Sequence, residues 1–148
     1  MRPLNFPAYG FRLKNSENTT RIFDVIRKRF VVLQPEEWVR QHVINYLMLD
    51  KKYPKGLINV EKQLKVNTLN KRYDVVVFKP DGHIAVLVEC KSPEIAITQH
   101  TFDQIARYNL PLKADYLMVT NGLQHYFCEM DFVAEKYRFL TDIPDFSR

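Results

Sequence analysis

Residues 72–91 read RYDVVVFKPDGHIAVLVECK and divide into two apolar segments joined by a polar turn. The segments 72–78 and 84–90 are rich in valine and other strand-forming residues, and the PDGH between them is a strong turn signal. Near-continuous apolar runs of this kind are expected for central strands that are covered on both faces. The stretch therefore predicts a hairpin at the centre of a sheet.

The sequence before this hairpin predicts a helix and a further strand. A helix is expected from about residue 35 to residue 52, because Pro35 suits a first turn and Val39 and Val43 follow at helical spacing. Residues 57–66, LINVEKQLKV, have the character of a strand, and the LNKR that follows is interpreted as the turn into the central hairpin.

The sequence after the hairpin predicts a second helix and two more strands. Thr98 is a suitable cap for a helix over TQHTFDQIARYN, which ends where Pro111 follows. Strands are then expected at 115–120 and 125–130. Because a helix between the third and fourth strands permits a crossover connection, we expect a mixed sheet of about five strands.

The chain is predicted to be a single α/β (α+β) domain over 1–148, with β extensions at both ends of its core. Residues 1–33 form the N-terminal extension, in which NSENTT is the bend of a hairpin and the basic run RKRF is interpreted as a solvated edge. Residues 34–131 form the core. Residues 132–148 form a C-terminal extension that adds a hairpin partner.

Composition narrows the classes of protein that the chain can belong to. The net charge of +5 and pI near 9.2 are compatible with a polyanionic partner. No apolar run is long enough to span a bilayer, so we expect no membrane partner. The two cysteines, Cys90 and Cys128, lie in predicted strands. We expect them to be reduced, buried thiols in a cytoplasmic protein.

Three charged residues interrupt the apolar strands of the central hairpin. Glu89 and Lys91 are two residues apart, so in a strand they project to the same face. Asp74 interrupts the neighbouring strand. Because buried carboxylates are costly unless they are neutralised or coordinated, a bound divalent cation is one explanation, and oxygen ligands favour Mg²⁺ or Mn²⁺ over zinc. The alternative is a set of ordinary ion pairs, Asp74 with Arg72 or Lys71 and Glu89 with Lys91.

The spacing of these residues resembles the signature of the PD-(D/E)xK nuclease superfamily. The segments PEEWVRQ, KRYDVVVF, VLVECKSP, DQIARYN and LMVTNGLQHY together are similar to the N-terminal domain family of type I restriction enzyme R proteins, over roughly residues 34–131. The match departs from the superfamily pattern at Tyr73, where a proline is usual. The resemblance implies a restriction-endonuclease-like core.

The resemblance also implies roles for individual residues. Asp74 and Glu89 would hold one or two metal ions together with the backbone carbonyl of Cys90, and Lys91 would position or activate the attacking water. A glutamate from the preceding helix often completes such sites. The helical face that carries Val39 selects Glu36 for this, with Glu37 as second choice. Gln104 and Tyr108, four residues apart on the second helix, resemble the Q-x-x-x-Y pattern of related nucleases.

The resemblance therefore predicts an Mg²⁺- or Mn²⁺-dependent deoxyribonuclease, the cutting module of a restriction or defence system. Its partners would be DNA and the motor or methyltransferase subunits of such a system, because the sequence has no phosphate-binding loop of a motor. The alternative prediction is a non-catalytic module on the same fold that binds nucleic acid or docks on partner subunits.

Overall fold

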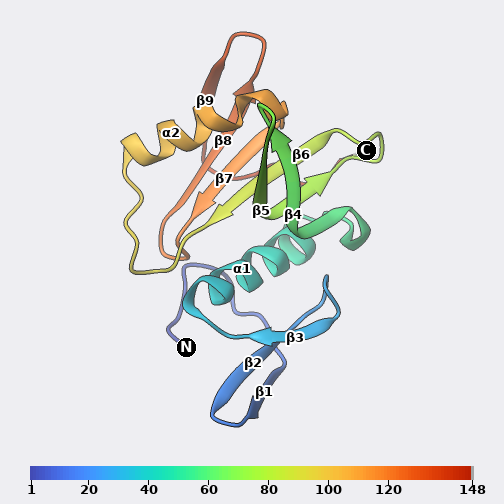
Figure 1. Cartoon of the computed structure of the whole chain (residues 1–148), viewed down its shortest axis with the longest axis vertical. Helices are drawn as coiled ribbons and strands as arrows, with labels where there is room; N and C mark the ends of the chain where they lie inside the picture. Colours follow the sequence, from blue (N-terminus) through green and yellow to red (C-terminus); the bar gives the residue numbers. More distant parts are fainter. Residues whose placement is uncertain (148) are drawn as a thin grey trace.

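The predicted central hairpin lies in the middle of a six-stranded sheet in the computed structural model, which describes residues 1–147 (Figure 1). The order of the strands in this sheet follows the chain from β4 to β9. β6 and β7 are parallel and every other neighbouring pair is antiparallel, so the sheet is mixed as predicted. The six strands are β4 (Ile58–Val66), β5 (Leu69–Phe78), β6 (Ile84–Cys90), β7 (Tyr116–Thr120), β8 (His125–Asp131) and β9 (Lys136–Leu140).

Two helices cover the two faces of this sheet. α1 (Pro35–Asn45) packs Val39 and Val43 into one apolar cluster with alternate residues of β5 and β6. α2 (Gln99–Asn109) packs Phe102 into a second cluster on the other face. All seven residues of β6 are buried because both faces of this strand are covered.

The two helices differ in how closely their ends follow the local sequence. The α-helical part of the first helix ends at Asn45, earlier than predicted, and the chain continues as a wider π-helical turn over Tyr46–Asp50. The Tyr46 hydroxyl donates to the Asp142 carboxylate, which ties this turn to the C-terminal segment. The second helix begins as predicted, because the Thr98 hydroxyl accepts a hydrogen bond of 3.1 Å from the Thr101 N–H.

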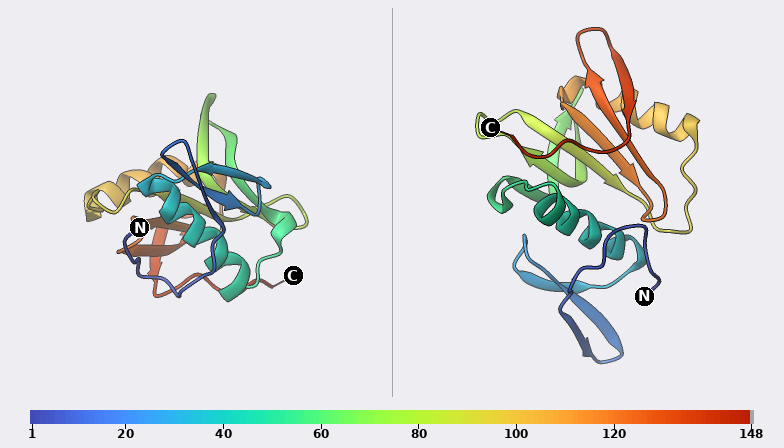
Figure 2. Two further views of the ribbon diagram at one scale, coloured as in Figure 1. Left: turned by 90° about the horizontal axis from the view of Figure 1, so that it is seen from below. Right: turned by 180° about the vertical axis from the view of Figure 1, so that it is seen from behind.

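The N-terminal extension is a separate three-stranded sheet, where the sequence predicted only a hairpin. Its strands are β1 (Leu13–Ser16), β2 (Thr19–Asp24) and β3 (Arg29–Val32), and β3 includes half of the RKRF run. α1 lies between this small sheet and the large one, as Figure 1 and the right-hand view of Figure 2 show.

The turn between β4 and β5 was predicted at residues 69–72, which is two residues too late. Asn67 and Thr68 form it, with φ angles of 49° and 71°, and Leu69 already pairs with Val66. Two residues with positive φ make the tight turn that suits the twist of a two-residue hairpin. LNKR therefore belongs to β5, which brings Lys71 into the sheet.

The C-terminal extension adds β9 to the edge of the sheet, as predicted, and then returns toward the end of the first helix. The N–H of Phe146 donates to the Lys51 carbonyl at 2.8 Å, and the Tyr53 hydroxyl donates to the Pro144 carbonyl at 2.8 Å. Among the residues that the structure describes, no helix combines the length and the apolar character needed to cross a membrane.

Candidate active site

Asp74 and Glu89 occupy neighbouring positions on the two central strands. Val75 pairs with Val88, and Asp74 and Glu89 are the next residues along β5 and β6 beyond this pair. The regular alternation of β5 is interrupted at Asp74. Tyr73 and Val76 both pack on the α2 side of the sheet, whereas Val75 packs on the α1 side. This irregularity directs the Asp74 carboxylate toward α1 and the end of β6.

The Asp74 carboxylate is partly buried and lies among other charges. One oxygen accepts the N–H of Cys90 at 2.7 Å, and the other accepts from Arg40 Nη2 at 3.2 Å. Burial raises the pKa of Asp74 to about 6, and the charges of Glu36 and Glu89 add to the rise, although the Cys90 N–H and Arg40 oppose it. A carboxyl whose pKa is displaced this far is characteristic of functional sites.

Glu89 is held by a lysine that the sequence interpretation had placed in a turn. Lys71 Nζ lies 2.6 Å from Glu89 Oε1. The same ammonium lies 4.8 Å from the centre of the Tyr108 ring and 5.0 Å from that of Tyr73, both within cation–π range. The predicted site residue Tyr108 of α2 is thus brought to the site through Lys71. Gln104, one helical turn earlier, is exposed on the same helix.

Lys91 remains available for chemistry. Its backbone N–H continues the pairing with β7 by donating to the Thr120 carbonyl at 2.8 Å. Within residues 1–147 its ammonium forms no salt bridge, so the predicted alternative of a Glu89–Lys91 ion pair is not what the structure shows.

The two candidate glutamates of α1 have different surroundings. Glu37 is paired with Arg27 at 2.9 Å and Arg40 at 3.5 Å. Glu36 is exposed, and its charge contributes to the raised pKa of Asp74. Of the two, Glu36 is therefore the one whose carboxylate is not engaged by an arginine among residues 1–147.

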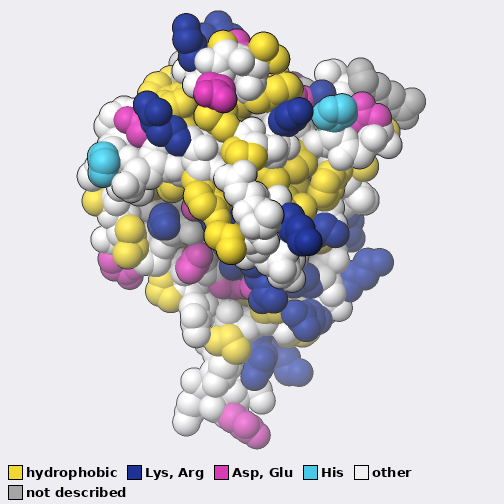
Figure 3. Space-filling model, turned by 45° about the horizontal axis from the view of Figure 1, so that its top comes forward, with side chains coloured by type: hydrophobic (Ala, Val, Ile, Leu, Met, Phe, Trp, Pro, Cys, Tyr) yellow, Lys and Arg dark blue, Asp and Glu magenta, His cyan; other side chains and the backbone are white. Residues whose placement is uncertain are grey.

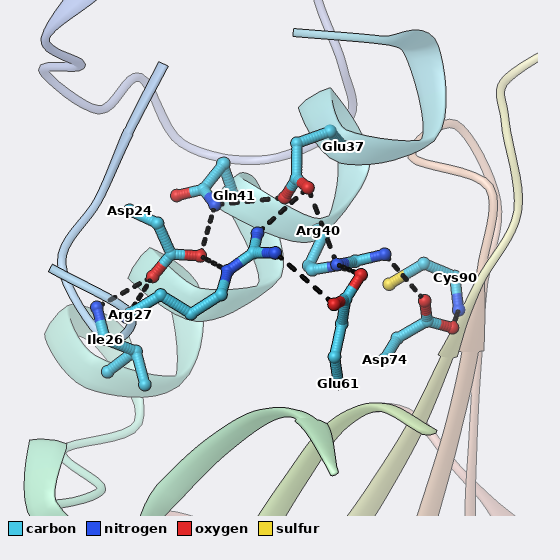
Figure 4. A network of polar contacts seen from close by, with 9 residues as sticks. All are labelled: Asp24, Ile26, Arg27, Glu37, Arg40, Gln41, Glu61, Asp74 and Cys90. Atoms are coloured by element: carbon cyan, nitrogen blue, oxygen red, sulfur yellow. Dashed lines mark hydrogen bonds and ion pairs between the residues drawn. The ribbon is translucent and has the colours of Figure 1, made fainter. Parts of the chain in front are cut away.

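A network of charged and polar side chains joins the N-terminal sheet to Asp74 (Figure 4). It contains two guanidinium groups, each shared among several acids. Arg40 Nη1 lies 3.0 Å from Glu61, whose other oxygen lies 3.7 Å from Arg27. The members, in order from the small sheet to the central strands, are Asp24, Arg27, Gln41, Glu37, Glu61, Arg40 and Asp74.

The sequence interpretation missed the cations of both acids. Its ion-pair alternative named Arg72 or Lys71 for Asp74 and Lys91 for Glu89. The structure instead pairs Asp74 with Arg40 and Glu89 with Lys71. A signal for Arg40 was present, because it lies next to Val39 on the buried stripe of α1, four residues after Glu36. No local signal identified Lys71, because its role depends on the register of β5 with β6.

The residues offer the type of ligand atom that a hard divalent cation prefers, but their side chains are not arranged as a complete metal site. Asp74, Glu89, Glu36 and the Cys90 carbonyl offer oxygen ligands, which Mg²⁺ and Mn²⁺ prefer. No three His, Cys, Asp or Glu side chains within residues 1–147 are grouped closely enough to hold a metal ion. Binding would therefore require Asp74 and Glu89 to exchange their protein cations for the metal.

Exposed basic side chains provide a surface for a polyanion. Lys and Arg side chains gather on the lower right of the face drawn in Figure 3. Arg27 does not belong to this surface, because it is engaged with acids and only 13% exposed. The exposed basic residues of the small sheet and of the β4–β5 hairpin are Arg12, Lys14, Lys28, Arg29, Lys62, Lys65 and Arg72.

Comparison with known families places the site within a described domain. A model of the family described as type I restriction enzyme R protein N terminus matches residues 35–144. The matched segment begins at α1 and contains the whole six-stranded sheet and α2, but not the small N-terminal sheet. No curated protein matches the chain.

Proposed function

The chain belongs to the family of type I restriction enzyme R protein N termini, and from this we propose that it is a Mg²⁺- or Mn²⁺-dependent nuclease that hydrolyses phosphodiester bonds of DNA. It would act as the cutting module of a restriction system. Membership of the family supports a nuclease-related role in such a system, and the dependence on metal and the chemistry are the proposal.

The arrangement of Asp74, Glu89 and Lys91 is the observation that carries this proposal. Two acids occupy adjacent positions on the neighbouring strands β5 and β6, and Lys91, whose ammonium forms no salt bridge within residues 1–147, lies two residues from one of them. The raised pKa of Asp74 shows that the fold holds its charge at a cost. Proteins keep such groups where an ion or a reaction compensates for them.

Each residue has a specific task in this proposal. Asp74, Glu89, Glu36 and the Cys90 carbonyl hold the cation, which when bound lowers the pKa of a water molecule and stabilises charge on the phosphate. Lys91 orients that water or contacts the same phosphate. Gln104 contacts the DNA backbone from the exposed face of α2, with Tyr108 beside it.

The remaining surface would bind DNA without reading its sequence. The exposed arginines and lysines of the small sheet and of the β4–β5 hairpin contact phosphates, which position a protein on DNA but carry no sequence information. Motor or methyltransferase subunits are the proposed protein partners, and the cytoplasm is the proposed location.

The proposal is tested by incubating supercoiled plasmid and single-stranded DNA with the purified chain and Mg²⁺ or Mn²⁺. We expect metal-dependent cutting that Asp74→Ala and Lys91→Ala both abolish. Cutting that survives both substitutions would assign the activity to another site or to a contaminant.

A second candidate is a non-catalytic module that binds nucleic acid or docks on partner subunits. It is favoured by the ion pairs themselves, because Arg40 and Lys71 already neutralise the two central acids. Calorimetric titration with Mn²⁺ separates the two functions. A nuclease binds the metal through Asp74, whereas the module binds DNA and shows no Mn²⁺ binding that Asp74→Ala removes.

A further inference from the structure

Asp74 and Glu89 are each paired with a cation of the protein itself, Arg40 and Lys71. Of these two cations, only Arg40 is buried. We propose that Arg40 is the counter-ion of Asp74 in the metal-free protein. When a divalent cation binds the Asp74 carboxylate, the Arg40 guanidinium withdraws to Glu37 and Glu61. This inference rests on the proposed function and adds a positioning residue that regulates access of the metal.

The guanidinium of Arg40 cannot leave for solvent in the way that Lys71 can. The Arg40 side chain is 9% exposed, whereas that of Lys71 is 32% exposed. Removing one partner of a buried ion pair is strongly unfavourable when the other charge is left alone. If the metal displaces Arg40, a second acceptor must therefore be within reach.

Glu61 and Glu37 are those acceptors. Arg40 Nη1 lies 3.0 Å from Glu61 and 3.5 Å from Glu37, whereas only Nη2 contacts Asp74, at 3.2 Å. Arg40 Nε is buried without a hydrogen-bond partner among the described residues. Nη1 is thus anchored, and the guanidinium can pivot about this contact so that Nη2 leaves Asp74 for the acids that already hold Nη1.

The backbone of β4 is distorted in a way that serves this contact. Glu61 has a φ angle of 54°, and it lies between Val60 and Lys62, which both pair regularly with β5. A residue other than glycine rarely adopts this conformation, and such strain persists where the surrounding structure requires it. Here it presents the Glu61 carboxylate to Arg40.

Arg27 keeps the receiving acids in place. It lies 2.9 Å from Glu37 and 3.7 Å from Glu61, and it is fixed in turn by Asp24 at 2.8 Å (Figure 4). Because Arg27 does not contact Asp74, the two arginines have different roles. Arg27 holds the acceptors, and Arg40 exchanges between them and the metal ligand.

The inference predicts opposite effects for two neighbouring substitutions. Arg40→Met removes the competitor for Asp74, so we expect Mn²⁺ to bind about tenfold more tightly by calorimetry. Glu61→Gln weakens the acceptor to which Arg40 withdraws, so we expect Mn²⁺ to bind several-fold more weakly. Arg138→Met is the control, because it removes an arginine that is paired with Glu129 at 2.9 Å and lies outside this network. Its Mn²⁺ affinity should stay within about twofold of the wild type.

A direct readout distinguishes displacement from a general change in charge. Addition of Mg²⁺ should shift the NMR signal of the Arg40 Nε–H group and leave that of Arg27 in place. Unchanged or weaker Mn²⁺ binding in Arg40→Met would show that Arg40 only orients Asp74 and would overturn the inference.

The remaining outcomes distinguish a failure of the Arg40 inference from a failure of the proposed metal site. If Arg40→Met does not fold, an unchanged or higher affinity in the half-exposed Glu61→Gln overturns the inference by itself. If Mn²⁺ binds the wild type and Asp74→Ala removes that binding, the proposed metal site stands whatever Arg40 does. If Mn²⁺ binds no variant, the proposed function fails and this inference fails with it.

Discussion

Replacing Asp74 with asparagine is expected to stabilise the metal-free protein at pH 8, although it breaks a buried ion pair. Burial is the largest cause of the raised pKa of Asp74, and Glu36 and Glu89 add to it. Arg40 loses one acceptor but keeps Glu61 at 3.0 Å. The asparagine oxygen can still accept the Cys90 N–H. The substitution therefore removes an unfavourable charge and leaves few groups without a partner.

The size of the effect follows from the pKa. Because the pKa of Asp74 rises from 3.8 to about 6 on folding, the folded protein binds this proton more tightly than the unfolded chain does. The stability that the protonated carboxyl confers is present below 3.8 and is lost as the pH rises through 6. At about 1.4 kcal/mol per pH unit, the loss is about 3 kcal/mol, of which about 2 kcal/mol develops between pH 4.5 and pH 8.

The assay is urea unfolding of the wild type and Asp74→Asn at pH 4.5 and pH 8, without divalent cations. We expect the free energy of unfolding of the variant to exceed that of the wild type at pH 8, and the difference to shrink by about 2 kcal/mol at pH 4.5.

Asp24→Asn is the matched control, with the opposite sign. Asp24 is fully buried, but hydrogen bonds from Arg27 and Gln41 outweigh its burial and lower its pKa. This substitution should therefore destabilise the protein at pH 8. If Asp74→Asn is also destabilising at pH 8, or if its effect does not change with pH, then Arg40 fully compensates the Asp74 charge and our interpretation of this carboxyl is refuted.

Three further substitutions test the site and the fold. Lys91→Ala should lower the rate of plasmid cutting by at least about 100-fold while calorimetric Mn²⁺ affinity is unchanged; a parallel loss of affinity would instead make Lys91 part of metal binding. Gly122→Ala should lower the free energy of unfolding in urea by about 1–3 kcal/mol, because the φ angle of Gly122 is 88° and a Cβ there would lie 2.9 Å from Leu4. Gly10→Ala is the control and should be nearly neutral, because a Cβ at Gly10 meets nothing within 4 Å. Thr98→Ala should cost about 1 kcal/mol by the same measurement through loss of the α2 cap, and Thr98→Ser should restore most of it.

The sequence alone determined the elements whose signals are local. The β6 strand matches its predicted bounds, and α2 begins after Thr98 as predicted, because apolar runs, turns and caps depend on residues within a few positions of one another. The same local patterns predicted the mixed sheet, which the structure shows, and selected Asp74 and Glu89 as candidate site residues. They also carried the resemblance to the family that the match over residues 35–144 confirms.

Only the tertiary structure decided which cation each acid faces. Arg40 and Asp74 are 34 residues apart, and Lys71 and Glu89 are 18 apart, so neither pair is visible in any local pattern. Their pairing depends on how α1 packs across the sheet and on the register of β5 with β6. The strained backbone of Glu61 is likewise set by contacts with Arg27 and Arg40, because charges buried together must find partners wherever the fold brings them.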